Sequence, residues 1–228
     1  AGDVLELDLD TVRAAGGITG SPQAVAVSAT SVGAGSGGWL RVVTCGADAE
    51  TSNVNYAGPA PTPNQVIVEL SDTDTICVET NVDTHVVVDL FGVFDEASTI
   101  SADEPNRLVD TRERNGLPVA GGSVTEIQVA HPDDGPLPSG VVVNLTLVDP
   151  AQPTFATVYP CASGRPSSSS INLDVGIASN AAIVAPDADG KICVYSLALS
   201  HLIVDVMGDA GESFEGRRPL RLLDTRTR

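Results

Sequence analysis

The chain has 228 residues, and its 12 lysines and arginines against 30 aspartates and glutamates give a formal net charge of −18. Such an acidic balance argues against binding to nucleic acid or to an anionic membrane surface, because both need clustered cationic side chains. Hydrophobic residues make up 42% of the chain, enough for a folded core, and no run of about 18 apolar residues is present that could span a membrane as a helix.

Strands and turns dominate the predicted secondary structure, because Val, Thr and Ser are abundant and the 22 glycines and 15 prolines interrupt any helical pattern. In 141–147, Val143, Leu145 and Leu147 alternate with Asn144 and Thr146, which is typical of a half-buried strand. For the second half of the chain we predict eight strands, at 107–112, 123–129, 140–148, 155–161, 169–174, 180–185, 191–196 and 200–207. This density predicts an antiparallel β-sandwich, Ig-like or jelly-roll-like, with a closed barrel as the alternative.

An internal repeat covers nearly the whole chain. Segment 200–208 matches 84–92 at an offset of 116 residues, and 138–143 matches 22–27 at the same offset. We therefore predict two tandem β-sandwich modules, the first at 1–96 and the second at 104–210, followed by a linker and strand at 211–228.

The four cysteines follow the same repeat. Cys45 and Cys77 lie 32 positions apart, as do Cys161 and Cys193. Identical spacing predicts one disulfide in each module, which would stabilise it by about 3–4 kcal/mol. Metal binding is the weaker alternative, since no Cys-x-x-Cys pair and no cluster of histidines occurs, and we expect no cofactor. Paired cysteines are also consistent with an oxidising, extracellular location.

A short motif opens the second module and recurs near the end of the chain. Segment 105–112 reads PNRLVDTR and segment 219–226 reads PLRLLDTR. The first module lacks such an opening strand, so we expect an unfilled strand position there and a C-terminal strand able to fill one. The predicted assembly strand consists of Arg221, Leu222, Leu223, Asp224, Thr225 and Arg226.

Three interpretations of this C-terminal strand remain open. The chain is a fragment of a longer repeat array, or the strand inserts into the first module of a neighbouring copy, or it folds back onto its own first module. Insertion into a neighbour produces a head-to-tail fibre unless the rotation closes a ring. The charges of the two ends of the chain fit pairing of the C-terminal strand with a first module. Acidic residues open the chain, namely Asp3, Glu6, Asp8 and Asp10, and arginines close it, namely Arg217, Arg218, Arg221, Arg226 and Arg228.

Several motifs together resemble a repeat of secreted and cell-surface proteins of actinobacteria and neighbouring groups. They are the segments 107–112, 142–146, 159–161, 169–173, 191–193 and 201–208, which include Arg-Leu-x-Asp-Thr-Arg, Tyr-Pro-Cys and His-x-x-x-Asp-x-x-Gly. The first copy departs from the pattern at Ala26, Ser28, Thr30 and Thr44. The resemblance implies an extracellular modular role and attaches no activity to the chain.

Candidate chemical groups are interpreted mainly as structural. His85 and His201 precede equivalent apolar strands, and we expect their rings to bond turn backbone rather than to form a catalytic pair with the aspartates four residues later. Strand alternation places Arg107, Val109 and Thr111 on one face and the intervening residues on the other, with Asp110 pairing Arg112. No Gly-x-Ser-x-Gly setting surrounds the serines at 167–170, so we predict that the chain is not an enzyme.

Two binding alternatives complete the predictions. Calcium is a minor possibility at the acidic loops 72–74 and 187–190, although neither has a full ligand set. A carbohydrate-binding or adhesion role at a cell-surface glycan is the main alternative function, but we expect most of Trp39, Tyr56, Tyr159 and Tyr195 to be core residues. The preferred interpretation is a secreted structural protein that assembles with itself through its C-terminal strand.

Overall fold

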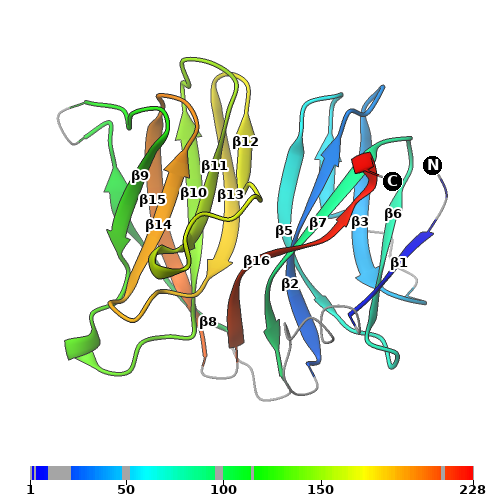
Figure 1. The fold of residues 1–228 in the computed structure, drawn as a ribbon, viewed down its shortest axis with the longest axis horizontal. Helices are drawn as coiled ribbons and strands as arrows, with labels where there is room; N and C mark the ends of the chain where they lie inside the picture. Colours follow the sequence, from blue (N-terminus) through cyan, green and yellow to red (C-terminus); the bar gives the residue numbers. More distant parts are fainter. Residues whose placement is uncertain are drawn as a thin grey trace. The chain divides into compact units, whose positions relative to one another are not determined.

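The computed structural model describes residues 2, 4–9, 22–47, 52–95, 100–113, 116–211 and 214–227. These residues form strands and three short 3-10 helices, and no α-helix occurs among them, which confirms the predicted all-β class. The chain divides into two compact units, hereafter the first unit (Ala1–Glu96 with Leu220–Arg228) and the second unit (Ala97–Pro219). The C-terminal segment 211–228 is therefore divided between the two units after Pro219 (Figure 1).

The second unit has two four-stranded sheets, ordered β13-β10-β15-β8 and β12-β11-β14-β9. Neighbouring strands run antiparallel in both sheets. The strands are β8 (Ile100–Asp110), β9 (Ser123–Gln128), β10 (Gly140–Val148), β11 (Thr154–Pro160), β12 (Ile171–Leu173), β13 (Ile177–Val184), β14 (Lys191–Ser196) and β15 (His201–Ala210). Two 3-10 turns, η1 (Pro132–Asp134) and η2 (Cys161–Ser163), lie between them.

The core of the second unit is built from both sheets. Val143, Leu145 and Leu147 of β10 belong to the same buried cluster as Ile192 and Val194 of β14 in the other sheet. The predicted alternation along β10 is thus confirmed, and two sheets that share one core make a sandwich rather than a closed barrel.

The first unit also has two four-stranded sheets, ordered β1-β6-β3-β4 and β16-β7-β2-β5. Its strands are β1 (Val4–Asp8), β2 (Ala24–Val32), β3 (Gly38–Thr44), β4 (Val54–Tyr56), β5 (Thr62–Glu69), β6 (Thr75–Thr80), β7 (His85–Phe94) and β16 (Phe214–Asp224), which continues into η3 (Thr225–Thr227). The core combines Leu40 and Ile76 of one sheet with Val27 and Leu90 of the other. Leu223 of the C-terminal strand belongs to the same core.

Both units share one strand order, and it is that of a jelly roll. In the second unit the last strand, β15, lies between β8 and β10 in one sheet, and β14 lies between β9 and β11 in the other, which is the interleaved order of two Greek keys. The opening strand β8 lies beside the last strand, β15. In the first unit the place of β8 is taken by β16, so a strand from the far end of the chain completes this unit.

Disulfide bonds join both predicted cysteine pairs, Cys45 with Cys77 and Cys161 with Cys193. Each bond ties the end of one strand to the middle of its neighbour in the same sheet, β3 to β6 and β11 to β14. Two disulfides are compatible with an extracellular protein. Within the described ranges, no helix is long and apolar enough to cross a membrane.

Candidate assembly site at the opening strand of each unit

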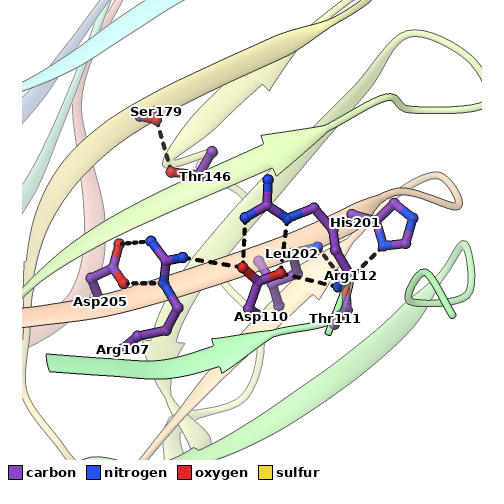
Figure 2. A network of polar contacts seen from close by, with 9 residues as sticks. All are labelled: Arg107, Asp110, Thr111, Arg112, Thr146, Ser179, His201, Leu202 and Asp205. Atoms are coloured by element: carbon purple, nitrogen blue, oxygen red, sulfur yellow. Dashed lines mark hydrogen bonds and ion pairs between the residues drawn. The ribbon is translucent and has the colours of Figure 1, made fainter. Parts of the chain in front are cut away.

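Arg107 links two aspartates of the second unit through its guanidinium group. Its Nε donates to Asp205 Oδ1 on β15 at 2.8 Å, and its Nη1 donates to Asp110 Oδ2 at 3.2 Å (Figure 2). One carboxylate lies on β8 itself and the other on the neighbouring strand, so Arg107 fastens β8 laterally to β15. Both contacts are charge-assisted hydrogen bonds, which are stronger than neutral ones.

Asp110 closes the end of β8 by accepting several hydrogen bonds from Arg112. The backbone N–H of Arg112 donates at 3.0 Å, Nε at 2.9 Å and Nη2 at 2.6 Å. The Asp110 side chain is only 2% exposed, so these bonds replace its lost hydration. Hydrogen bonds from Arg112 lower the pKa of Asp110 to about 2, and the pKa of Arg112 is raised in return. The predicted pairing of these two residues is present.

Thr111 connects the end of β8 to the beginning of β15. Its Oγ1 accepts the backbone N–H of Leu202 at 3.0 Å and lies 3.1 Å from His201 Nδ1. Figure 2 shows the threonine between the histidine ring and the Asp110–Arg112 pair. A hydroxyl that satisfies a buried backbone N–H cannot be removed without leaving that donor unpaired.

A β-bulge in β8 explains why these side chains meet. Val109 pairs with Val204 while Arg107 pairs with Asp205, so Leu108 is an extra residue on the β8 side. The bulge shifts the alternation by one residue, which brings Arg107 and Asp110 to the same side of the strand. The prediction that alternation separates these two side chains was therefore wrong.

The first unit repeats this ion-pair arrangement with residues of the C-terminal strand. Arg221 Nε donates to Asp89 on β7, and its Nη1 donates to Asp224 Oδ2 at 2.8 Å. Arg226 donates to Asp224 through its backbone N–H at 3.1 Å, Nε at 2.8 Å and Nη2 at 2.6 Å. These hydrogen bonds lower the pKa of Asp224, as those of Arg112 do for Asp110.

Thr225 occupies the position that Thr111 has in the second unit. Its Oγ1 accepts the backbone N–H of Val86 at 2.8 Å and lies 3.5 Å from His85 Nδ1. Every polar group of the predicted assembly strand therefore has the same type of partner in the first unit as its equivalent on β8 has in the second unit. Leu222 packs against the core between these polar contacts.

Burial differs between the two sites. The side chain of Asp89 is 4% exposed, against 14% for Asp205. Burial raises the pKa of Asp89, with the hydrogen bond from Arg221 opposing that change. Leu223 is 2% exposed in the core of the first unit, and Val109 is 7% exposed in the core of the second. The acceptor carboxylate and the core side chain are thus more deeply buried in the first unit, whereas the motif aspartate is more exposed there, 14% for Asp224 against 2% for Asp110.

The first half of β16 belongs to the second unit and packs there. Phe214 is buried, and a Cβ on Gly140 would lie 2.6 Å from its ring, so only glycine leaves room for this phenylalanine. Arg218 donates to the carbonyl of Arg165 at 3.0 Å. One strand is therefore shared between units, with the boundary after Pro219, a residue that has no N–H to contribute to a strand ladder.

Other predicted partners of these residues differ from expectation. His85 and His201 contact threonine hydroxyls, and Asp89 and Asp205 bind arginines, whereas turn backbone was the expected partner of both the rings and the carboxylates. Of the acidic residues near the start of the chain, Glu6 and Asp8 lie on β1, which belongs to the sheet that does not contain β16. The predictions for Asp3, Asp10 and Arg228 fall outside the described residues.

The acidic loops considered for calcium contain turn-forming hydrogen bonds. Asp187 Oδ1 accepts the backbone N–H groups of Asp189 and Lys191 at 3.0 and 2.9 Å. At the equivalent position of the first unit, Ser71 accepts the N–H of Thr73 and Thr75 in the same manner. Among the residues that the structure describes, no group of three or more His, Cys, Asp or Glu side chains is placed to hold a metal ion.

The aromatic residues divide into buried and half-buried sets. Tyr56 and Tyr159 are buried as predicted, whereas Trp39, Phe155 and Tyr195 are half-buried. The rings of Phe155 and Tyr195 lie 5.8 Å apart on β11 and β14. Arginines cover two of these rings, Arg41 over Trp39 at 5.2 Å and Arg165 over Tyr195 at 4.0 Å.

Comparisons of the chain with known protein families and with curated proteins find no match.

Proposed function

We propose that this protein is a secreted, non-enzymatic structural subunit that assembles head to tail into a fibre or stalk. In this assembly, the segment Arg221–Arg226 of one copy completes the first unit of the next copy. The supporting observation is that the segment repeats, contact for contact, what β8 does in the second unit. A strand that is integral to a sandwich but supplied from the far end of the chain is suited to exchange between copies.

Chain direction favours donation to a following unit. Strand β8 leaves the end of the first unit and completes the unit that follows it in the chain. Strand β16 leaves the second unit in the same way, and in the proposed assembly the unit that it completes is the first unit of another copy. In the structure β16 lies on β7 of its own chain, and the same contacts serve in either case.

The acceptor edge of the first unit is energetically unfavourable without a bound strand. Without β16, β7 becomes the edge of the sheet β7-β2-β5, and its backbone groups lose their partners. The N–H of Val86 and the buried carboxylate of Asp89 both lose their hydrogen bonds as well. An unfilled first unit therefore binds a second chain in preference to remaining open.

A charge-swap mixing experiment distinguishes donation between copies from closure within one copy. Asp89→Arg places an arginine in the acceptor opposite Arg221, and Arg221→Asp places a carboxylate opposite Asp89. Each variant alone is expected to lose its fibres, because like charges meet at the joint. Mixed in equal amounts, they form an alternating polymer in which both joints again pair opposite charges.

Negative-stain electron microscopy and light scattering report the outcome. The matched control is the pair Asp205→Arg and Arg107→Asp, which alters the corresponding contact inside the second unit, where mixing is expected to restore nothing. Monomers in every sample, including the unaltered chain at high concentration, would contradict the proposal. In that case the strand closes its own first unit.

A carbohydrate-binding or adhesion role is the second candidate. It is favoured by the half-buried ring of Phe155 on β11, on which a sugar ring can stack beside Tyr195, whose own ring is covered by Arg165. Glycan-array binding that is lost in Phe155→Ala, with the disulfides and the thermal stability unchanged, supports this role. Absence of binding, together with polymers of the unaltered chain, removes it.

A further inference from the structure

We infer that the acceptor edge of the first unit recognises a strand by the pattern Arg-Leu-x-Asp-Thr-Arg, so that it binds the β8 segment of another chain as well as the C-terminal strand. This inference rests on the proposed function, because it needs an acceptor that can be filled from another molecule. It adds the class of partner, namely any chain that presents an extended segment with this pattern.

Equivalent acceptor groups in the two units support this recognition. In the first unit they are the carboxylate of Asp89, the ring of His85 and the N–H of Val86. In the second unit Asp205, His201 and Leu202 supply the same three groups, each 116 positions later in the chain. Since both acceptors present the same groups to the same motif, a strand that fits one has the polar groups needed for the other.

Within the motif, the donor segments 105–112 and 219–226 differ at two positions. Leu223 of β16 is replaced in β8 by Val109, and both side chains lie in their unit's core. Leu220 is replaced by Asn106, but Leu220 is 39% exposed. The arginines, the aspartate and the threonine that the two motifs share make the ion pairs and the threonine contact described above. The β8 segment therefore fits the first unit with one methylene group fewer in the core.

This difference predicts a graded affinity. A peptide of residues 214–227 binds most tightly, and the motif in a peptide of residues 100–113 is expected to bind about fourfold more weakly, because burying one methylene group fewer costs roughly that factor. Val109→Leu in the second peptide restores the lost affinity. Arg107→Ala in the same peptide weakens binding by at least about tenfold, because Asp89 is then buried without its arginine.

The test uses the 228-residue chain with Arg221→Asp, which retains the C-terminal strand but weakens its occupation of the acceptor. Fluorescein-labelled peptides are titrated and binding is followed by fluorescence anisotropy, with a scrambled 214–227 peptide as the control. A second protein, ending at Pro219, is tested by the rise in melting temperature that each peptide produces. This readout works even when the first unit is unstable alone, since binding then stabilises the folded state.

The outcomes separate the inference from the proposed function. Binding of both peptides, in the expected order and with rescue by Val109→Leu, supports the inference. Binding of the 214–227 peptide without the 100–113 peptide overturns it and leaves strand donation between copies standing. Failure of both peptides overturns it too, and the charge-swap mixture then decides the proposed function independently.

Discussion

The two opening strands, β8 and β16, carry the same Arg-Leu-x-Asp-Thr-Arg motif and make the same contacts through it, yet the chain delivers them in opposite ways. β8 enters its unit directly from the preceding unit, whereas β16 completes a unit that begins more than 200 residues earlier. The comparison teaches that a strand's own side chains decide which edge it fits. The connectivity of the chain decides whether that edge belongs to the same molecule or to another.

The sites also differ in how much they bury. The first unit has a larger core side chain at Leu223 and a less exposed acceptor carboxylate at Asp89, whereas its motif aspartate, Asp224, is more exposed than Asp110. Deeper burial of Leu223 and of Asp89 strengthens the contact between the strand and the first unit, and it also makes the acceptor without its strand less stable. Loss of the opening strand is therefore expected to destabilise the first unit more than loss of a single edge strand usually does.

Removing the part of β16 that completes the first unit is expected to produce the largest difference in stability between the two units. A chain ending at Pro219 is expected to lower the melting temperature of the first unit by about 15 °C or more, since loss of Leu223 burial alone costs about 3 kcal/mol. Differential scanning calorimetry should show the transition of the second unit unchanged. Equal shifts of both transitions, or of neither, would contradict this dependence on β16.

Core truncation compares the two strands at one equivalent position. Leu223→Ala should destabilise the first unit by about 3 kcal/mol and Val109→Ala the second by about 2 kcal/mol, because more buried volume is lost from leucine. Urea unfolding followed by the fluorescence of Trp39, the only tryptophan, reports on the first unit. Leu220→Ala serves as the control, with an effect below about 0.5 kcal/mol because Leu220 is substantially exposed.

The threonine contact should matter equally in the two units. Thr225→Ala and Thr111→Ala each remove the acceptor of a backbone N–H, on Val86 and Leu202, and should cost about 1–2 kcal/mol in their own unit. Serine at either position restores the hydroxyl and most of the stability. Amide hydrogen exchange of Val86 and Leu202 measures the effect, and unchanged protection in the alanine variants would show that the hydroxyl contributes little.

Acid is expected to produce the smallest difference in stability between the two units. Asp110 has its pKa lowered to about 2, so its contribution to the second unit is complete above the unfolded-state value near 3.9 and is lost as the pH falls toward 2. Asp224 acts in the same direction in the first unit. Asp89 opposes it, because a raised pKa gives a contribution that is largest in acid and is lost as the pH rises through the folded-state value.

Substituting Asp89 therefore sharpens the acid response of the first unit. In Asp89→Asn the opposing titration is absent, so the first unit should lose more of its stability between pH 7 and pH 3 than it does in the unaltered chain. Urea midpoints at the two pH values, read from Trp39, measure this difference. Asp205→Asn is the control in the second unit, and an identical acid response of the Asp89→Asn and unaltered first units would refute the opposing role of Asp89.

Features encoded by local pattern and spacing could be predicted from the sequence. Alternation in 143–147 identified the buried face of β10, and identical spacing identified both cysteine pairs. Recurrence of the Arg-Leu-x-Asp-Thr-Arg motif identified the C-terminal segment as a strand that completes a unit. Each of these depends on residues close together in the chain or on a comparison of one copy with the other, and both kinds of information are present in a single sequence.

The tertiary structure decided what depends on register between distant strands. The bulge at Leu108 places Arg107 and Asp110 on the same face of β8 instead of the opposite faces expected from alternation. It arises from pairing with β15, close to a hundred residues away in the chain. The same long-range pairing selects the jelly-roll order and brings Arg221 to Asp89 across 132 positions. Alternation within one strand carries no information about the register of its partner, so these contacts emerge only when the sheets are assembled.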